Sequence, residues 1–251
     1  MKIEFHYTYI LVALGFILTG YLPNLIIFTS LILIHEIGHF TIAKLYKLNV
    51  EKITIYPYGG LVKMNNLLNT SITKELHVAL SGIIFQSIYY IIIILLYKQG
   101  LIREYIINLF STYHKSILIF NILPIHPLDG SKILNLLLSK TLPFNLTNKL
   151  TIIISIITLI IIIKINYYNL NYTMILVLII IINNITKYQK ELKYIFNKFL
   201  LERYIYHISY KKTKKINNIN NMYKEKYHII KENNSYVTEK QALNHKFQRK
   251  T

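Results

Sequence analysis

The longest uncharged stretch of the sequence covers residues 5–34, which contain no Lys, Arg, Asp or Glu. One transmembrane helix needs about 20 apolar residues, so this stretch is too long for a single span and has to be divided. The natural division lies at Gly20 and Pro23, because glycine suits turns and proline is poor in the interior of a helix. We therefore expect one membrane span over residues 5–19 and a second over residues 23–46.

The rest of the chain supports a membrane protein. Of the 251 residues 53% are hydrophobic and only 16% are charged, which is too apolar for a water-soluble domain of this size. Further apolar stretches predict spans over residues 76–97, 105–123, 150–163 and 172–185. The predicted fold class is an all-α polytopic membrane protein with about six transmembrane helices.

One short segment departs from the helical pattern. Residues 53–64, ITIYPYGGLVKM, are rich in β-branched and aromatic side chains around the pair Gly59 and Gly60. We expect a short re-entrant β-hairpin here. An exposed edge of this hairpin would pair with an extended peptide and position it, and the alternative is a hairpin that only covers the helices.

The basic residues are concentrated near the C-terminus. The net charge of +18 divides into +7 for residues 1–186 and +11 for residues 187–251. We therefore predict two domains, a transmembrane domain over 1–186 and a basic cytosolic tail over 187–251. Six spans with Lys and Arg mostly on one side place both termini in the cytosol. The tail is expected to lie near anionic lipid headgroups, and nucleic-acid binding is the less favoured alternative.

The types of metal ligand are limited by composition. Without any Cys, the chain can form neither disulfides nor thiolate zinc sites. Metal ligands have to be His, Asp or Glu. The sequence contains Asp once, at Asp129, so chemistry that needs an aspartate has one candidate.

The second predicted span contains His35-Glu36-Ile37-Gly38-His39. Two His residues four positions apart project from one face of a helix and can bind one metal ion. Glu36 is placed to reach a water beside the metal. The alternative is purely structural, with His bonded to a neighbouring helix and Glu reaching toward water. Ionisable groups at membrane depth are costly and usually functional, which favours the metal site.

Asp129 is the candidate for a third ligand. Catalytic zinc sites usually take three protein ligands, and Asp129 stands in NILPIHPLDG at the end of the fourth predicted span. In the six-span topology this end and the end of the span with His39 face the same side of the membrane. Asp129 would alternatively be the N-cap of a following helix. His126, between two prolines, is a weaker candidate ligand.

These two motifs together resemble the site-2 protease family of intramembrane zinc metalloproteases. Its signatures are His-Glu-x-x-His and a later Asn-x-x-Pro-x-x-Pro-Leu-Asp-Gly type segment. Within that family, residues 33–64, 123–144 and 199–204 are similar to the stage IV sporulation protein FB branch of endospore-forming bacteria.

The resemblance implies an intramembrane metalloendopeptidase with one Zn²⁺ ion. The roles that it implies are metal ligation by His35, His39 and Asp129, general base catalysis by Glu36, and substrate positioning by Asn121 and Pro124. It also implies a membrane-associated pro-sigma factor as substrate, regulatory or inhibitory membrane proteins as partners, and a place in the membrane around the forespore on the mother-cell side.

The sequence departs from the family pattern at two places. The family often carries Ser-Gly-Pro in its third span, and this chain has Ser81-Gly82-Ile83, which changes a kink and not a ligand. Relatives end in a cystathionine-β-synthase-type domain, and residues 227–247 are similar only to the latter part of such a domain. The tail is therefore expected to hold at most a truncated remnant of it.

Two other functions are weighed against proteolysis. A membrane metal-ion transporter would carry several acidic residues along its pore, and the predicted spans hold almost none besides Glu36 and Asp129. A catalytically inactive membrane scaffold would have no need of Glu36, yet every catalytic position is occupied. Peptide-bond hydrolysis near the cytosolic face of the membrane is therefore the favoured reaction.

Overall fold

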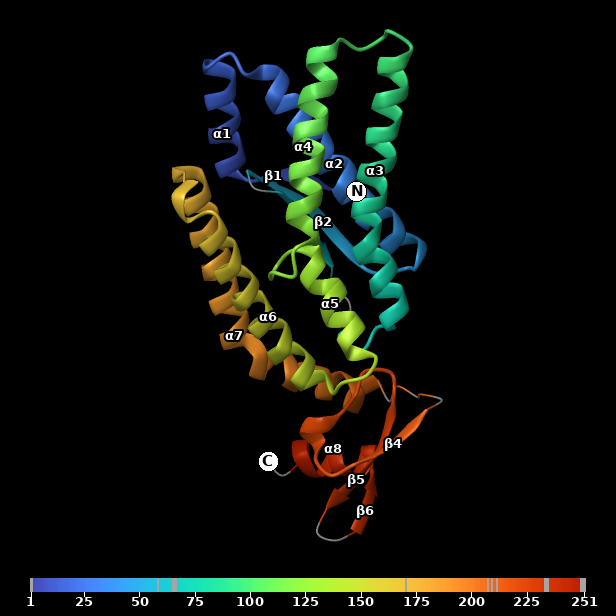
Figure 1. The fold of residues 1–251 in the computed structure, drawn as a ribbon. Helices are drawn as coiled ribbons and strands as arrows, with labels where there is room; N and C mark the ends of the chain where they lie inside the picture. Colours follow the sequence, from blue (N-terminus) through green and yellow to red (C-terminus); the bar gives the residue numbers. More distant parts are fainter. Residues whose placement is uncertain are drawn as a thin grey trace. The chain divides into compact units, whose positions relative to one another are not determined.

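The computed structural model describes residues 2–57, 59–64, 67–169, 171–206, 208, 210, 212–232 and 235–248 (Figure 1). The chain is mostly helical with small sheets. It divides into two compact units, of which unit 1 holds Met1–Asn66 and Leu76–Leu123, and unit 2 holds Leu67–Glu75 and Pro124–Thr251.

Helices occupy all six places where spans are predicted. They are α1 (Tyr7–Leu18), α2 (Leu22–Leu45), α3 (Ile72–Lys98), α4 (Glu104–Ile122), α6 (Phe144–Ile165) and α7 (Tyr172–Tyr206). Within the described part of the chain, α2, α3 and α6 are the helices that are long and apolar enough to cross a membrane. Three candidate spans are thus established, and the count of six stays a prediction.

The break between α1 and α2 falls where the sequence predicts it. Gly20 has a φ of +79°, a backbone conformation that glycine adopts without steric cost. Helix α2 begins at Leu22 with Pro23 in its first turn, where the missing N–H of proline is not needed. Residues 7–45 therefore form two helices and not one continuous helix.

Unit 1 contains a three-stranded sheet. Strand β2 (Val50–Tyr56) pairs antiparallel with β3 (Gly59–Met64), as the sequence predicts, and parallel with β1 (Ile3–Phe5). Strand β1 was not predicted, because three residues are too few to show an alternating pattern. Tyr58, which belongs to the predicted hairpin, lies outside the described residues, and the re-entrant character of the hairpin stays a prediction.

Helix α2 is covered by apolar groups from two directions. On one side Ile32 is buried with Tyr9 of α1 and with Ile53 and Ile55 of β2. In a second cluster, Leu31 and Ile27 of α2 pack with buried residues of α3 and α4, which run alongside each other in Figure 1. Burial of these apolar side chains stabilises the position of α2 within unit 1.

Unit 2 contains the remaining helices and a second sheet. Helix α5 (Asp129–Ser139) precedes α6, and α7 leads to β4 (Thr213–Ile216), β5 (Tyr227–Glu232), β6 (Ser235–Thr238) and α8 (Glu239–Gln248). The sheet has the order β4-β5-β6, with β4 and β5 parallel. Phe199 and Leu200 of α7 are buried against residues of β5 and α8. The C-terminal segment is thus folded, and it shares this core with Phe144 of α6.

A buried polar network joins α7 to this second sheet. Arg203 donates hydrogen bonds to the Glu239 carboxylate at 3.0 Å and to the Tyr223 carbonyl at 2.7 Å. The Nε2 atom of His228 accepts the N–H of Tyr223 at 3.0 Å, while its Nδ1 lies 2.9 Å from Glu239. Since Nε2 accepts, Nδ1 carries the proton and donates to the carboxylate, and His228 is neutral.

The two titratable groups of this network are shifted in the same direction. Burial lowers the pKa of His228 below its ordinary value, although the carboxylate of Glu239 acts against this shift. Burial alone would raise the pKa of Glu239, but the hydrogen bond from His228 and the charge of Arg203 outweigh it and hold that pKa low. Both groups therefore bind protons more readily in the unfolded state.

Acid should loosen this part of unit 2. Where the unfolded state binds more protons, stability decreases as the pH is lowered. The loss therefore begins as the pH falls through the unfolded pKa of His228, about 6.5, and continues toward the lower folded values. We expect hydrogen–deuterium exchange of β5, corrected for intrinsic rates, to rise by at most about tenfold per pH unit for one such group. His228→Gln keeps a donor and an acceptor but does not titrate, so it should remove the part of this pH dependence that begins near the unfolded His pKa. An unchanged profile in this variant would contradict the assignment.

Candidate metal centre

Three chemically active side chains of α2 are buried together. His35, Glu36 and His39 are 3%, 6% and 5% exposed. Their ligand atoms all lie within 4.8 Å of one another, and they form a group able to hold a metal ion. The spacing of four places both imidazoles on one face of α2, as the sequence predicts.

His39 is oriented by the main chain of α3. Its Nδ1 lies 2.7 Å from the carbonyl oxygen of Val78, which can only accept a hydrogen bond. Nδ1 therefore carries the proton, and the lone pair of a neutral imidazole is left on Nε2. A second hydrogen bond of this kind is the usual way in which proteins orient a metal-binding histidine.

His35 is turned toward the same point. Its Nδ1 lies 3.1 Å from Oε1 of Gln86, again on α3, and its Nε2 lies 3.1 Å from Nε2 of His39. A zinc ion bound tetrahedrally by two nitrogens at about 2.0–2.1 Å holds those nitrogens about 3.3 Å apart. The imidazole pair thus fits a zinc ion with little movement.

Glu36 faces a different neighbour from the histidines. It is offset by about 100° around the helix from His35, and it meets β3 at Gly60. A Cβ atom on Gly60 would collide with Cγ of Glu36 and would lie 2.7 Å from its Oε1. A side chain at residue 60 would have to displace Glu36, so the sheet borders the carboxylate directly at Gly60.

Gly82 forms the wall against the histidines. A Cβ atom on this residue of α3 would collide with Nε2 of His39 and would lie 2.6 Å from Nε2 of His35. The space beside both nitrogens therefore exists because residue 82 has no side chain. Sequence reasoning treated Ser81-Gly82-Ile83 as a matter of helix kinking and missed this contact.

Asp129 belongs to unit 2 and is described there. It is 5% exposed, and its Oδ1 accepts a hydrogen bond from Nζ of Lys132 at 2.9 Å. Helix α5 begins at Asp129 with Leu128 in the N-cap position, so Asp129 is a first-turn residue and the capping alternative is wrong. Metal ligation by Asp129 rests on the sequence and on the family resemblance.

The other predicted positions lie at the ends of elements. Asn121 is in the last turn of α4, and Gly59 opens β3 with a φ of +149°. The Pro124 carbonyl accepts a hydrogen bond from the Ser155 hydroxyl at 3.1 Å. His126 stacks on the ring of Tyr188, 4.1 Å between centroids, which gives it a packing role in unit 2.

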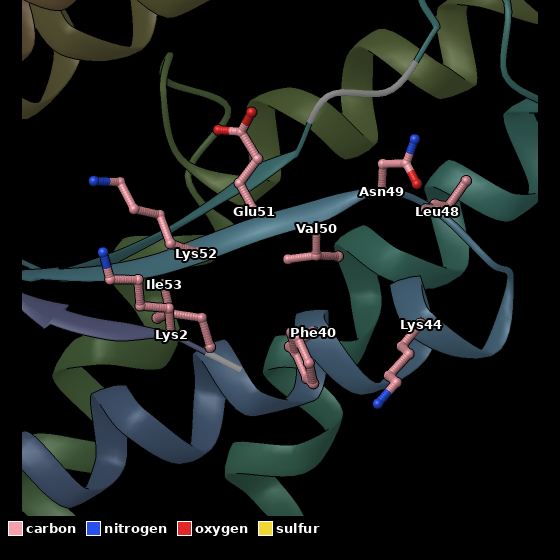
Figure 2. Close-up of a pocket in the computed structure, with 9 residues that line it drawn as sticks. All are labelled: Lys2, Phe40, Lys44, Leu48, Asn49, Val50, Glu51, Lys52 and Ile53. Carbon is pink, nitrogen blue, oxygen red and sulfur yellow. The ribbon is translucent and has the colours of Figure 1, made fainter.

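A separate groove lies beside this centre in unit 1. Figure 2 shows its lining residues on β2 and on the C-terminal end of α2. The volume of the groove is about 780 Å³. Its lining residues are Lys2, Phe40, Lys44, Leu48, Asn49, Val50, Glu51, Lys52 and Ile53. The carboxylate of Glu51 is paired with Lys63 at 2.8 Å. The groove is thus a basic surface feature without histidine and not the metal centre itself.

Known proteins match this chain over part of its length. Residues 23–115 match Peptidase family M50. Over 153 residues the chain is 34% identical to Stage IV sporulation protein FB of Bacillus subtilis strain 168, covering 61% of this chain and 53% of the relative. It is 29% identical over 154 residues to a zinc metalloprotease of Methanocaldococcus jannaschii, covering 56% of this chain and 43% of that relative.

A solved structure has the same fold. The site-2 protease from Methanocaldococcus jannaschii matches with a TM-score of 0.59 and 24% identity, covering 74% of this chain and 91% of that chain. The chain spans about half the length of the curated relatives it matches. These similarities confirm the family resemblance predicted from the two motifs.

Gly82→Ala should block metal binding. The added Cβ occupies the space beside the two Nε2 atoms, and both imidazoles are tied at Nδ1 and cannot easily withdraw. We expect zinc affinity, measured by chelator competition in detergent, to fall at least about tenfold, as for loss of an orienting contact. Gly15→Ala on α1 is the matched control, because nothing lies within 4 Å of its Cβ position. Equal affinities in the two variants would show that the metal binds elsewhere.

Proposed function

We propose that this chain, in which residues 23–115 are a Peptidase family M50 domain of the site-2 protease kind, is an intramembrane zinc metalloendopeptidase. One observation carries the proposal. Two buried imidazoles point their Nε2 atoms at one place, 3.1 Å apart, with a buried carboxylate next to them. A structural histidine pair would not need the adjacent carboxylate.

The ligands that we assign to one zinc ion are His35, His39 and Asp129. The two imidazoles supply neutral nitrogen donors, and catalytic zinc sites usually take a third protein ligand and leave one position for water. Asp129 is the only aspartate of the sequence and stands in the second family motif. Its burial in the first turn of α5 suits an anionic ligand, because helix N-termini stabilise negative charge.

Glu36 is the proposed general base. A zinc ion held there would polarise the scissile carbonyl and lower the pKa of the attacking water toward neutrality. Glu36 accepts the proton of that water and passes it to the leaving amine, which is the ordinary task of a positioned carboxylate. Gly60 lies directly against this side chain, which is 6% exposed.

Strand β3 is proposed to receive the substrate. Among the described residues it has β2 on one side and no strand on the other. An extended peptide added to this free edge would expose its carbonyls, which a helical substrate hides, and would lie close to Glu36. In this proposal Gly59 and Gly60 position the substrate from the strand. Asn121, in the last turn of α4, and Pro124, which follows that helix, are assigned the same role from the family motif.

The proposed topology has six spans with both termini in the cytosol. The distribution of Lys and Arg supports it, and it places hydrolysis near the cytosolic face. Residues 1–186 would form the membrane protease and residues 187–251 a cytosolic part held near anionic lipids. The half-exposed isoleucines along α3 and α6, such as Ile92 and Ile161, suit contact with lipid.

The proposed substrate is the pro-sequence of a membrane-associated sporulation sigma factor. This follows from the similarity to Stage IV sporulation protein FB, 34% over 153 residues, together with the cytosolic placement of the site. The same similarity favours the membrane around the forespore as location and membrane proteins as inhibitors or regulators.

Glu36→Gln should abolish cleavage without removing the metal. The test co-expresses the full chain with a candidate pro-sigma factor in a heterologous bacterium and measures zinc in the purified protein. Loss of a general base should lower the rate by roughly 10²–10⁴-fold, with zinc retained. Asp129→Asn should lose zinc as well as cleavage. Glu104→Gln, at the exposed start of α4, is the control and should behave like wild type.

Each protein in this experiment tests a different part of the proposal. Cleavage at the wild-type rate by Glu36→Gln would remove the base assignment. Full zinc content in Asp129→Asn would move the third ligand elsewhere. A wild type that binds zinc but leaves this substrate intact would contradict the substrate assignment alone, and trimmed membrane proteins would then be sought across the proteome.

Substrate pairing along β3 can be tested by crosslinking. A photo-reactive amino acid in place of Leu61, which is 48% exposed on β3, should form adducts with substrate trapped by the Glu36→Gln variant. The same group at Leu18, exposed at the end of α1, should not. Adducts of equal yield at both positions would contradict strand pairing.

A further inference from the structure

Gln86 is a fully buried amide beside the metal centre. It lies on α3 in an apolar stretch and has no exposed surface. Its Oε1 lies 3.1 Å from Nδ1 of His35, and its Nε2 lies 3.1 Å from the carbonyl oxygen of His114 on α4. A buried amide of this kind is costly unless every polar atom is bonded.

The direction of this amide follows from its partners. The His114 carbonyl can only accept a hydrogen bond, so the NH₂ group of Gln86 faces it and Oε1 faces His35. The Nδ1 atom of His114, 3.3 Å from Gln86 Nε2, accepts on the same side. Turning the amide over would place oxygen against oxygen. Oε1 is therefore held as an acceptor toward His35.

His114, the partner of Gln86 on α4, is also held in place. The ring of His114 is stacked on Tyr90, with centroids 4.2 Å apart and an interplanar angle of 12°. The amide thus connects α2, α3 and α4 at one point. Its rotamer is determined by α4 and by packing, and not by the metal.

We propose that Gln86 is a positioning residue that selects the tautomer of His35 and aims its Nε2 at the metal. An acceptor at Nδ1 places the proton of His35 there and leaves the lone pair on Nε2, where it meets Nε2 of His39. Val78 does the same for His39 through a backbone carbonyl, which no substitution removes. Of these two orienting contacts, only the one to Gln86 is a side chain. The inference rests on the proposed function and adds a residue to it.

The test compares two substitutions that differ in one property. Gln86→Met keeps the length of the side chain but offers no comparable acceptor to His35. Gln86→Glu keeps an oxygen acceptor toward His35. It replaces the amide donor that faces His114 with a second oxygen, to which Nδ1 of His114, 3.3 Å away, can donate in its other tautomer. Ser87→Ala is the control, because the Ser87 hydroxyl bonds only to the Ile83 carbonyl of its own helix turn among the contacts identified.

Zinc affinity by chelator competition and the visible spectrum of the Co²⁺-loaded full chain are the readouts. We expect Gln86→Met to weaken zinc binding by about 10–100-fold and to alter the Co²⁺ spectrum, as loss of an orienting partner does. Gln86→Glu should stay within about threefold of wild type, because carboxylate–histidine pairs orient metal ligands well. A role in packing alone predicts the reverse order, since Glu buries a charge and Met does not.

The outcomes distinguish the inference from the proposed function. A wild type that binds no zinc overturns both. Unchanged affinity in Gln86→Met with zinc bound by wild type overturns only the role of Gln86. If Gln86→Met does not fold, Gln86→Glu becomes the deciding variant. A tenfold or greater loss of zinc affinity in Gln86→Glu also overturns the role of Gln86. Near-normal zinc affinity with a normal Co²⁺ spectrum supports that role.

Discussion

The close approach of α2 and α3 is the constraint on which the metal centre depends. A Cβ on Gly38 would lie 2.6 Å from the Ser81 carbonyl oxygen, so these two backbones pass each other at a distance that only glycine permits. This approach brings the Val78 carbonyl and the Gln86 amide within hydrogen-bonding reach of the two imidazoles. With ordinary side chains at the crossing, the histidines would be buried without partners, at a considerable cost in free energy.

The two histidines and Glu36 lie on the same helix, α2, but they contact different elements. The histidines face α3, whose acceptors keep their Nε2 atoms unprotonated, while Glu36 faces a strand that leaves no room for any side chain at residue 60. A helix and a sheet are both needed, because neighbouring positions on a helix differ by about 100° and one wall cannot contact both. The site-2 protease fold supplies both walls within unit 1.

The sequence predicts the parts that depend on local spacing. The His-Glu-x-x-His pattern, the break at Gly20 and Pro23 and the strand pair β2–β3 are all readable because a helix repeats every 3.6 residues and a strand every two. Gln86 is far from His35 in the chain, so only tertiary structure reveals their contact, although one amide in an apolar stretch is a visible signal. Strands β1, β4 and β6 have three or four residues, too few for a periodic pattern to appear.

The separation of the two walls has a consequence for how such a protein can change over generations. A side chain at residue 60 of β3 would press on Glu36, whereas a side chain at residue 82 of α3 would press on the two imidazoles. A substitution at residue 60 would therefore disturb Glu36 and still leave two imidazoles able to hold an ion.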